Sequence, residues 1–547
     1  MWTKGWRDQV WSDLELPWDL IVIGGGITGA GILRESVRAG MKTLLLEACD
    51  FASGTSSRSS KLVHGGFRYL KNAQIKLTRE SVHERERLIR EGRGLITPLG
   101  FLMACYKQDP LPAWALGLGL TLYDLLAWKW GHRYYDPYDL RELCPSLSEE
   151  GLSGGYRYFD AETDDARLVL RVIQEAVLSG GVALNYAPVI RLLKTQSGQV
   201  CGAAVQDAAP ETKGRTAEVQ ASAIINATGA WADNLRQAVG GRLRLRQLRG
   251  SHLIFPAGKL PLTRAVSLWH PRDGRPVMAF PWEGVTLVGT TDIDHTAPLQ
   301  TDVTISAEEA DYLMAAVQMA FPDLELSLED VQGTFSGVRP VIGTGKADPS
   351  KESREHVLWF ENGLLTVAGG KLTTFRLMAL DALRAICKRL PGRRFRTRLG
   401  ANLRMLDQPP EVILQEGLSR ATRLRLLGRY GSRVPDLIAA AEPGELAPVE
   451  TSPSLWAELR WAARAEGVVH LDDLLLRRVR LGLQLPNGGA PFLDRIRLIA
   501  QPELGWDDTR WEQEAEAYRK LWEKYYDLPG SARISQASLV SNPFLKS

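Results

Sequence analysis

The chain has 547 residues, of which 44% are hydrophobic and 24% are charged, and its formal net charge at pH 7 is +3. This length predicts two or three domains, and this composition predicts a folded protein with a sizeable core. Together they exclude a small single binding module and wholesale disorder, and the near balance of 67 basic and 64 acidic residues argues against a dedicated nucleic-acid binder.

No strong signal for disulfides, metal binding, export or membrane spanning is present. The five cysteines lie far apart, without C-x-x-C pairs or zinc-type spacing, so we expect no disulfide scaffold and no metal site. Residues 1–10 carry charges where a signal peptide needs an apolar core. The longest uncharged apolar stretch, 110–123, is shorter than the roughly 20 residues of a spanning helix. We therefore expect neither export nor a membrane-crossing segment.

The N-terminal segment predicts a βαβ unit that binds a dinucleotide. A β-branched run at 19–23 precedes a glycine-rich turn, a helical stretch at 30–39 and a second strand at 42–47 that ends in an acid. The glycines suit a tight turn, close approach to a pyrophosphate and close helix packing, and the acid suits ribose hydroxyls and disfavours NADP. This unit alone does not distinguish NAD from FAD. The expected contacts are Gly24, Gly26, Ile27, Thr28, Gly29 and Glu47.

A hydroxyl-rich run follows at 51–60 and can wrap a phosphate and a ring edge, although its composition also fits a flexible serine-rich loop. Residues 61–70 then combine two basic side chains, a histidine, a glycine pair and a tyrosine, a combination that a surface loop does not need. The expected cofactor contacts in these two segments are Thr55, Ser56, Ser57, Ser60, Lys61, Leu62 and His64.

With these segments the sequence resembles the FAD-dependent glycerol-3-phosphate dehydrogenases of the respiratory, aerobic type, a branch of the glutathione-reductase-like and D-amino-acid-oxidase-like flavoproteins. The resemblance rests on 23–31 and 55–70 and on ordered blocks at 164–170, 226–231, 250–252, 289–292, 335–340 and 369–374. It covers about 19–380 closely, and the C-terminal third more loosely through 456–483.

This resemblance implies an α/β fold with a Rossmann-like FAD-binding domain, a substrate domain with an antiparallel sheet, and a C-terminal helical domain. It implies FAD as cofactor and oxidation of sn-glycerol 3-phosphate to dihydroxyacetone phosphate, with electrons passed to a membrane quinone. We expect the FAD-binding domain at 17–85, 160–240 and 331–388, the substrate domain at 86–159 and 241–330, and the helical domain at 389–547.

The later segments fit this organisation. A helix is expected at 164–179, strands at 182–186, 189–193 and 224–229, an antiparallel pattern of short strands over 242–331, and a strand at 365–370 followed by a helix at 373–386. We expect the Gly369–Gly370 turn against the flavin ring, and after about 389 a helical region for packing or a partner. The additional cofactor contacts are Val189, Ala227, Thr228, Gly229, Gly370, Lys371, Leu372 and Thr373.

Alcohol oxidation needs a base for the hydroxyl proton, and a phosphate ester needs a cationic anchor. His64 is the first candidate base and His252 a rival; Arg339 is the first candidate anchor. The candidate catalytic residues are thus His64, His252 and Arg339. The candidate substrate-binding residues are Arg68, Tyr69, His252, Arg339 and Lys371. Tyr69 either forms a hydrogen bond with the substrate or merely lines the pocket.

Two segments raise the question of membrane contact. The apolar run 111–130, with its Trp and Lys residues, fits either monotopic attachment, in which Leu120 and Leu122 would face lipid, or a buried core helix. The basic stretch 388–404 fits either anionic lipid or a solvated linker. The favoured interpretation is a cytoplasmic protein held peripherally on the inner face of the cell membrane, without nucleic acid, and a homodimer stays open.

Two other functions remain open at this point. The first is a glycerol-3-phosphate oxidase that uses O2, although the large insertion associated with oxidases is not evident. The second is a non-catalytic flavin-binding or nucleic-acid-associated module, against which the histidine, arginine and tyrosine of 64–69 argue, because binding alone needs no base.

Overall fold

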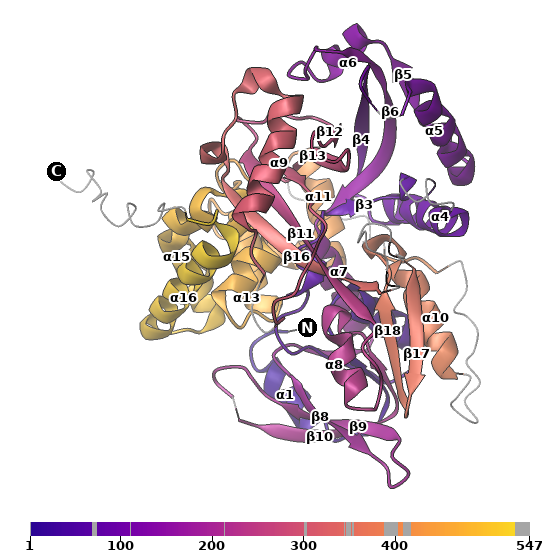
Figure 1. Ribbon diagram of the computed structural model, residues 1–547. Coiled ribbons are helices and arrows are strands. Elements are labelled where there is room, and N and C mark those ends of the chain that lie inside the picture. The colour runs from indigo at the N-terminus through magenta and orange to yellow at the C-terminus, as the bar shows by residue number, and fades with distance from the viewer. Residues whose placement is uncertain are drawn as a thin grey trace, which may run out of the picture.

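The computed structural model describes residues 2–67, 70, 74–109, 111–212, 214–299, 303–343, 345, 352, 355–387, 403–407 and 417–530. These residues form two sheets, with helices on the smaller sheet and a helical C-terminal region beside the larger one (Figure 1). Within this part of the chain, no helix is both long and apolar enough to span a membrane.

The smaller sheet has eight described strands and is mostly parallel. Its order is β17 (His356–Glu361), β18 (Leu364–Gly369), β10 (Thr216–Asn226), β1 (Trp18–Ile23), β2 (Thr43–Leu46) and β7 (Val182–Leu184), and β8 (Val189–Lys194) and β9 (Val200–Gln206) extend β10. Helices α2 (Ile27–Arg38), α7 (Asp165–Leu178) and α10 (Phe375–Cys387) pack together beside it. The buried faces of β1 and β2 explain their continuous apolar runs.

Three parallel strands of this sheet end at one edge. Ile23 of β1 pairs with Asn226 of β10, and β10 also runs parallel to β18. The turns that follow β1, β10 and β18 therefore meet, and these are the three turns for which the sequence predicts cofactor contacts.

The larger sheet has ten strands in the described residues. Its order is β15 (Ile293–Asp294), β11 (Leu245–Pro256), β14 (Val285–Gly289), β13 (Pro276–Trp282), β12 (Ala265–Trp269), β4 (Ile96–Tyr106), β6 (Leu152–Thr163) and β3 (Leu62–Val63), with β16 (Gly333–Ile342) on β11 and β5 (Arg133–Tyr135) on β6. Its pairs are antiparallel except β12 with β4. The α/β fold with an antiparallel second sheet is thus confirmed.

Two strands of the larger sheet come from segments expected in the FAD-binding domain, and one helix packs against this sheet. Helix α9 (Ala307–Ala320) lies inside 242–331, for which a pattern of short strands is expected. It begins with a capping box in which Ser306 and Glu309 accept hydrogen bonds from each other's backbone N–H. Strand β16 pairs along its whole length with β11, although residues 331–388 were assigned to the FAD-binding domain. The same holds for β3, which pairs with β6.

The remaining helices complete the described part. Around the sheets lie α1 (Trp6–Ser12), α4 (Ile75–Glu91), α5 (Ala113–Ala127), α6 (Pro137–Leu143) and α8 (Ala232–Gln237). The C-terminal region contains α11 (Arg420–Tyr430), α12 (Val434–Ala440), α13 (Trp456–Ala465), the π-helical turn η8 (Asp473–Arg478), α14 (Leu481–Gln484), α15 (Leu493–Leu504) and α16 (Asp508–Tyr526). It shares a hydrophobic core with the larger sheet: Trp282 and Phe335 of the sheet and Trp522 of α16 belong to one buried cluster. The helical C-terminal region is confirmed.

Candidate active site

A cavity of about 1510 Å³ lies between the two sheets. Its walls include the turns after β1, β10 and β18, the hydroxyl-rich loop, the face of β16 and part of α5. This volume exceeds the roughly 300–1,000 Å³ of ordinary small-molecule pockets, so it has room for a dinucleotide together with a small substrate.

The turn after β1 has the shape that a pyrophosphate requires. Gly24 has a φ of 112°, and a Cβ there would lie 2.6 Å from the carbonyl oxygen of Ala227. A Cβ on Gly29 would overlap the carbonyl oxygen of Gly24, so α2 packs against the turn only with glycine at 29. The N-terminal end of α2 borders the cavity at Gly26, Ile27 and Thr28, and its dipole favours an anion there. These residues fit a dinucleotide pyrophosphate.

Glu47 lies at the end of β2 and lines the cavity. Its carboxylate accepts hydrogen bonds from the backbone N–H groups of Gly25, at 2.5 Å, and Cys49, at 3.0 Å. Burial raises the pKa of Glu47, and these backbone hydrogen bonds partly offset the rise. The carboxylate is therefore held in one orientation at the point where a ribose is expected.

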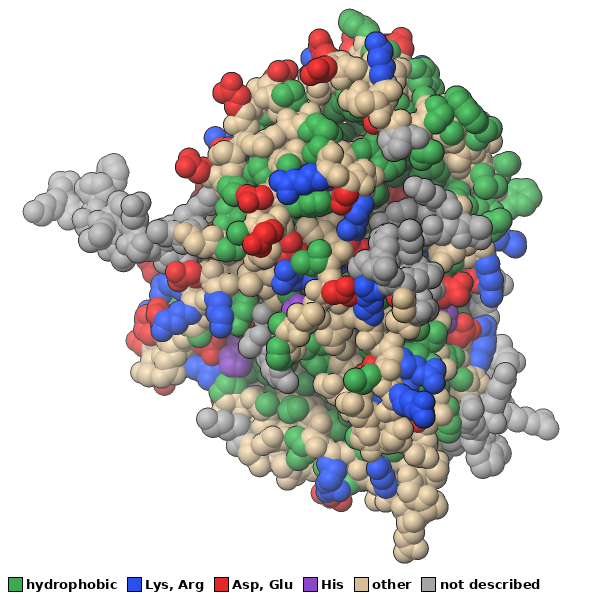
Figure 2. All heavy atoms as spheres, in the orientation of Figure 1, with side chains coloured by type: hydrophobic (Ala, Val, Ile, Leu, Met, Phe, Trp, Pro, Cys, Tyr) green, Lys and Arg blue, Asp and Glu red, His purple; other side chains and the backbone are tan. Residues whose placement is uncertain are grey.

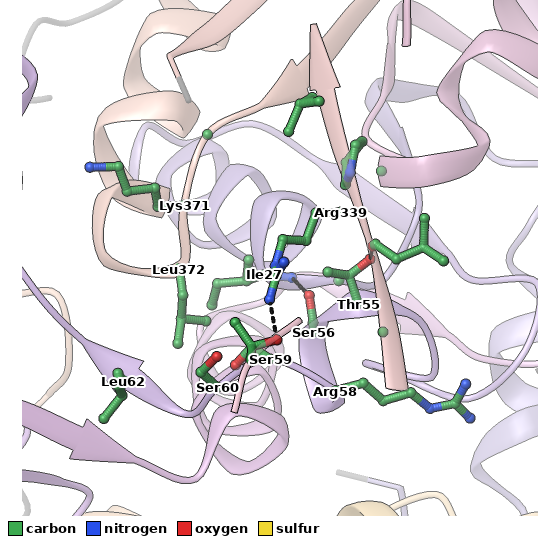
Figure 3. A pocket seen from close by; sticks show the side chains of 18 of the residues that line it. Ile27, Thr55, Ser56, Arg58, Ser59, Ser60, Leu62, Arg339, Lys371 and Leu372 are labelled. Carbon is green, nitrogen blue, oxygen red and sulfur yellow. Dashed lines mark hydrogen bonds between the residues drawn. The ribbon is translucent and has the colours of Figure 1, made fainter. Parts of the chain in front are cut away.

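The hydroxyl-rich loop folds over this end of the cavity (Figure 3). Ser56 Oγ accepts a hydrogen bond from the backbone N–H of Ile27 at 3.0 Å, and Thr55 Oγ1 donates to the carbonyl oxygen of Val338 at 2.5 Å. These bonds tie the loop to α2 and to β16. The loop is therefore an ordered wall of the cavity and not a flexible serine-rich segment.

Three predicted cofactor contacts are not among the described residues that line the cavity: Gly29, Ser57 and Lys61. Gly29 serves helix packing. The fully buried Lys61 amine donates instead to the Ser57 carbonyl oxygen at 2.9 Å and to the two carboxylate oxygens of Asp165 at 2.9 and 3.1 Å. Burial and then Arg480 lower the pKa of Lys61 to about 8, while Asp165 opposes them. The structure thus gives Lys61 an internal ion pair in place of a cavity contact.

The two candidate bases occupy different positions. His64 lines the cavity next to Leu62 and the Gly66 turn. His252 is completely buried behind Ser60: its Nε2 lies 2.9 Å from Ser60 Oγ, and its ring stacks on Phe335 at 4.5 Å. Burial, and then the charges of Arg339 and Lys61, hold the pKa of His252 well below its usual value.

This position separates His252 from the cavity. It is not among the described residues that line the cavity, whereas Ser60 is. Its neutral ring can orient the Ser60 hydroxyl, but the described geometry gives it no direct contact with a molecule in the cavity.

Arg339 of β16 faces the cavity with its side chain 24% exposed (Figure 3). Its Nη1 lies 3.2 Å from Asp292 Oδ1, and its Nη2 donates to Thr290 Oγ1 at 2.7 Å. On the other side of Asp292, Arg275 Nη2 lies 3.4 Å from Oδ2, and Arg275 also lines the cavity. Two guanidinium groups thus flank one carboxylate, which leaves a net positive charge suited to a phosphate.

The other predicted residues have these positions. Thr228, Gly229, Ala227, Val189, Gly370, Leu372 and Thr373 all line the cavity. Lys371 lines it too, but its Nζ donates to Ser81 Oγ on α4 at 2.8 Å and extends away from Arg339 (Figure 3). Arg68 and Tyr69 lie outside the described residues.

The cavity also reaches α5, where its lining is apolar. Leu116, Gly119 and Leu122 of α5 line it together with aromatic and aliphatic side chains from neighbouring segments, Phe67, Leu70, Phe101, Met103 and Tyr158. The same helix also turns apolar side chains to the surface: Trp114, Leu118 and Leu125 are exposed, with Trp114 at 68%, and Leu122 both lines the cavity and is partly exposed at the surface. Helix α5 therefore has an apolar face on both sides.

Several lining residues escaped the sequence analysis. Asp292 lies within a block that supports the resemblance, and Arg275 follows a Gly turn, so both had a local signal. Asp472 and Arg477 lie within 456–483, where the resemblance is loose, and no motif singles them out. Only the packing of η8 against the cavity identifies them.

Two family models match this chain. The model described as FAD dependent oxidoreductase matches residues 19–407, and the model described as C-terminal domain of alpha-glycerophosphate oxidase matches residues 392–511. Both matches agree with the division into a two-sheet part and a helical C-terminal part.

Individual proteins are similar over most of the chain. The aerobic glycerol-3-phosphate dehydrogenase of Staphylococcus haemolyticus is 36% identical over 491 residues, which cover 84% of this chain and 86% of that protein. Glycerol-3-phosphate dehydrogenase 2 of Mycobacterium bovis is 35% identical, with 91% and 87% covered. The crystal structure of the glycerol-3-phosphate dehydrogenase from Bacillus halodurans complexed with FAD superposes with a TM-score of 0.74 at 28% identity and covers 96% of this chain and 98% of its own.

Proposed function

The chain belongs to the FAD-dependent glycerol-3-phosphate dehydrogenase family and has FAD as its cofactor, and we propose that it oxidises sn-glycerol 3-phosphate to dihydroxyacetone phosphate and passes the electrons to a quinone. One observation carries this proposal: a single cavity contains a pyrophosphate-binding turn, a histidine and a guanidinium pair.

The residues that would hold FAD line one end of the cavity. The Gly24–Gly26 turn and the start of α2 would bind the pyrophosphate, Glu47 would bind a ribose, and the turns after β10 and β18 would complete the site. When bound, FAD supplies the two-electron acceptor that alcohol oxidation requires.

The protein supplies the remaining chemistry. Oxidation of the alcohol removes a hydride from its carbon, for which FAD would be the acceptor, and a proton from its hydroxyl. His64 accepts this proton at a ring nitrogen, because among the described residues it is the histidine that lines the cavity. Arg339, with Arg275 beside it, binds the phosphate, and Asp292 orients both guanidinium groups. Lys371 lines the same cavity, but its Nζ donates a hydrogen bond to Ser81 Oγ, so it is a weaker candidate for substrate contact than Arg339.

The apolar end of the cavity supports a quinone as acceptor. A quinone has an apolar ring and tail. Where the cavity reaches α5, its lining includes apolar side chains such as Leu116, Phe101 and Met103. Molecular oxygen would need no such lining. Oxygen is the alternative acceptor, because the C-terminal region also matches a domain model from an alpha-glycerophosphate oxidase.

The outer face of α5 supports peripheral attachment to the inner face of the cell membrane. Figure 2 shows hydrophobic side chains gathered over α5, and the exposed ones include Trp114, Leu118 and Leu125. An apolar helix face with Trp residues at its edge suits the lipid interface. Leu120, in contrast, is buried, so it is Leu118 and Leu125 that would meet lipid. In the basic stretch, 388–402 lies outside the described residues and Arg404 is exposed.

Anaerobic flavin bleaching tests the proposal. The purified yellow protein should lose its flavin absorbance on addition of glycerol 3-phosphate and regain it on addition of a quinone. Failure of glycerol 3-phosphate to bleach the flavin would reject the substrate. Normal bleaching with rapid reoxidation by oxygen and none by quinone would instead identify an oxidase.

A further inference from the structure

The C-terminal helical region reaches the cofactor end of the cavity. Arg477 lies in the π-helical turn η8, and Asp472 directly precedes this turn. Both line the cavity together with Glu47, Asp50 and Tyr186. The last three lie where β2 and β7 end: Glu47 N donates to the Leu184 carbonyl oxygen at 2.9 Å, and Ala187 N donates to that of Glu47 at 2.7 Å. This is the edge at which a dinucleotide-binding sheet receives the ribose.

The contact is made through one buried carboxylate. Asp50 Oδ2 accepts hydrogen bonds from Arg477 Nε and Arg478 Nη1, both at 2.6 Å, and Oδ1 accepts one from Arg478 Nη2 at 2.7 Å. Burial would raise the pKa of Asp50, but Arg478 and Arg477 lower it to about 2. Asp50 is therefore an ionised acceptor with no exposed surface, where charge-assisted hydrogen bonds are strong.

A second set of bonds closes the connection. Arg477 Nη2 donates to Asp472 Oδ2 at 2.6 Å and to Asp473 Oδ1 at 2.5 Å, and the hydroxyl of Tyr186 donates to Asp473 Oδ1 at 2.6 Å. Tyr186 in turn donates its backbone N–H to the carbonyl oxygen of Cys49 at 2.8 Å. Residues 47–50 and the η8 turn thus hold each other from two directions.

We infer that the C-terminal helical region is part of the FAD site and that Arg477 is a positioning residue for the adenosine half of the cofactor. Arg477 holds Asp50, and with it the segment that carries Glu47, against the cavity. Docking of the η8 turn and binding of FAD then stabilise each other, because a coupling between two events is reciprocal. The inference needs FAD binding alone and is independent of the substrate and of the electron acceptor.

The test measures FAD release from the intact holoprotein. After dilution of the holoprotein, the fluorescence of free FAD reports its release. Arg477→Gln should release FAD at least about tenfold faster than the parent, and a tenfold change corresponds to about 1.4 kcal/mol of coupling. The matched control is Arg425→Gln. Arg425 is an arginine of the same region whose side chain is 12% exposed. It pairs with Glu458 at 2.6 Å and with Glu283 at 3.0 Å, and it is not among the described residues that line the cavity. This control should release FAD at the parent rate.

A second measurement uses the parent protein alone and decides the question if Arg477→Gln does not fold. Amide hydrogen exchange of residues 467–480 should be slower in the holoprotein than after FAD has been removed. FAD release at the parent rate from folded Arg477→Gln, the same acceleration in Arg425→Gln, or exchange of 467–480 that does not respond to FAD would each overturn the inference.

Discussion

Replacing Arg339 by alanine should weaken the binding of glycerol 3-phosphate much more than that of glycerol. Truncation of one partner in a buried, hydrogen-bonded charge pair costs about 2–5 kcal/mol. The Arg339 side chain is 24% exposed, and Arg275 stays on the other side of Asp292 to offset its charge. We therefore expect the lower part of that range, about 2–3 kcal/mol, which is a rise of roughly 30- to 150-fold in the half-saturating concentration.

The assay is anaerobic flavin reduction, with glycerol 3-phosphate and glycerol as substrates for the parent and the variant. Glycerol lacks the phosphate, so its much slower oxidation should hardly change. Arg246→Ala is a matched control, since Arg246 lies on the adjacent strand β11, pairs with Asp294 at 2.6 Å and is not among the described residues that line the cavity. Equal losses for the two substrates in Arg339→Ala would refute the reasoning, because they would mean that Arg339 maintains the fold or the flavin environment.

Three further outcomes are expected. His64→Ala should slow flavin reduction by about 10²–10⁴-fold while the FAD content stays constant, and normal reduction would remove His64 as the base. The double variant Leu118→Glu with Leu125→Glu should no longer cosediment with anionic liposomes, and its flavin reduction should not be slower. The control Leu498→Glu changes a leucine of α15 that is 75% exposed, and it should cosediment like the parent. Cosedimentation of the double variant would reject α5 as the membrane-binding surface. Burial and then Glu283 raise the pKa of Glu162 to about 8, so its contribution to stability is fully present below its unfolded value near 4.5 and is lost as the pH rises through about 8. The free energy of unfolding of Glu162→Gln, measured in urea relative to that of the parent, should therefore be more favourable at pH 8 than at pH 5, by on the order of 1–3 kcal/mol. An equal difference between variant and parent at both pH values would contradict the raised pKa.

The dinucleotide-binding end of the site could be predicted from contiguous residues. A tight turn, a helix start and a strand end are local backbone features, so Gly24, Gly29 and Glu47 indicate them without knowledge of the rest of the chain. The positions of Ala227 to Gly229 and of Gly370 to Thr373 could be predicted for a related reason: parallel strands place their carboxyl ends at one edge.

Other assignments depended on packing between distant segments. Lys61 and Ser60 are neighbours in the sequence, yet Asp165 draws the Lys61 amine into the interior while Ser60 faces the cavity. His252 has the residue type of a base, but Ser60 and Phe335 enclose it. Similarly, the apolar run at α5 fits a core helix or a surface helix, and only its packing on β4 and β6 decides which leucines are exposed.

The sequence by itself therefore determined the βαβ unit, the chemical types present at the site and the family of the chain. The tertiary structure alone decided which of those side chains enter the cavity and that Arg477 reaches Asp50, 427 positions away in the chain. The physical reason is that backbone turns depend on local sterics, whereas the direction and the charge state of a buried side chain depend on partners that any segment of the chain can supply.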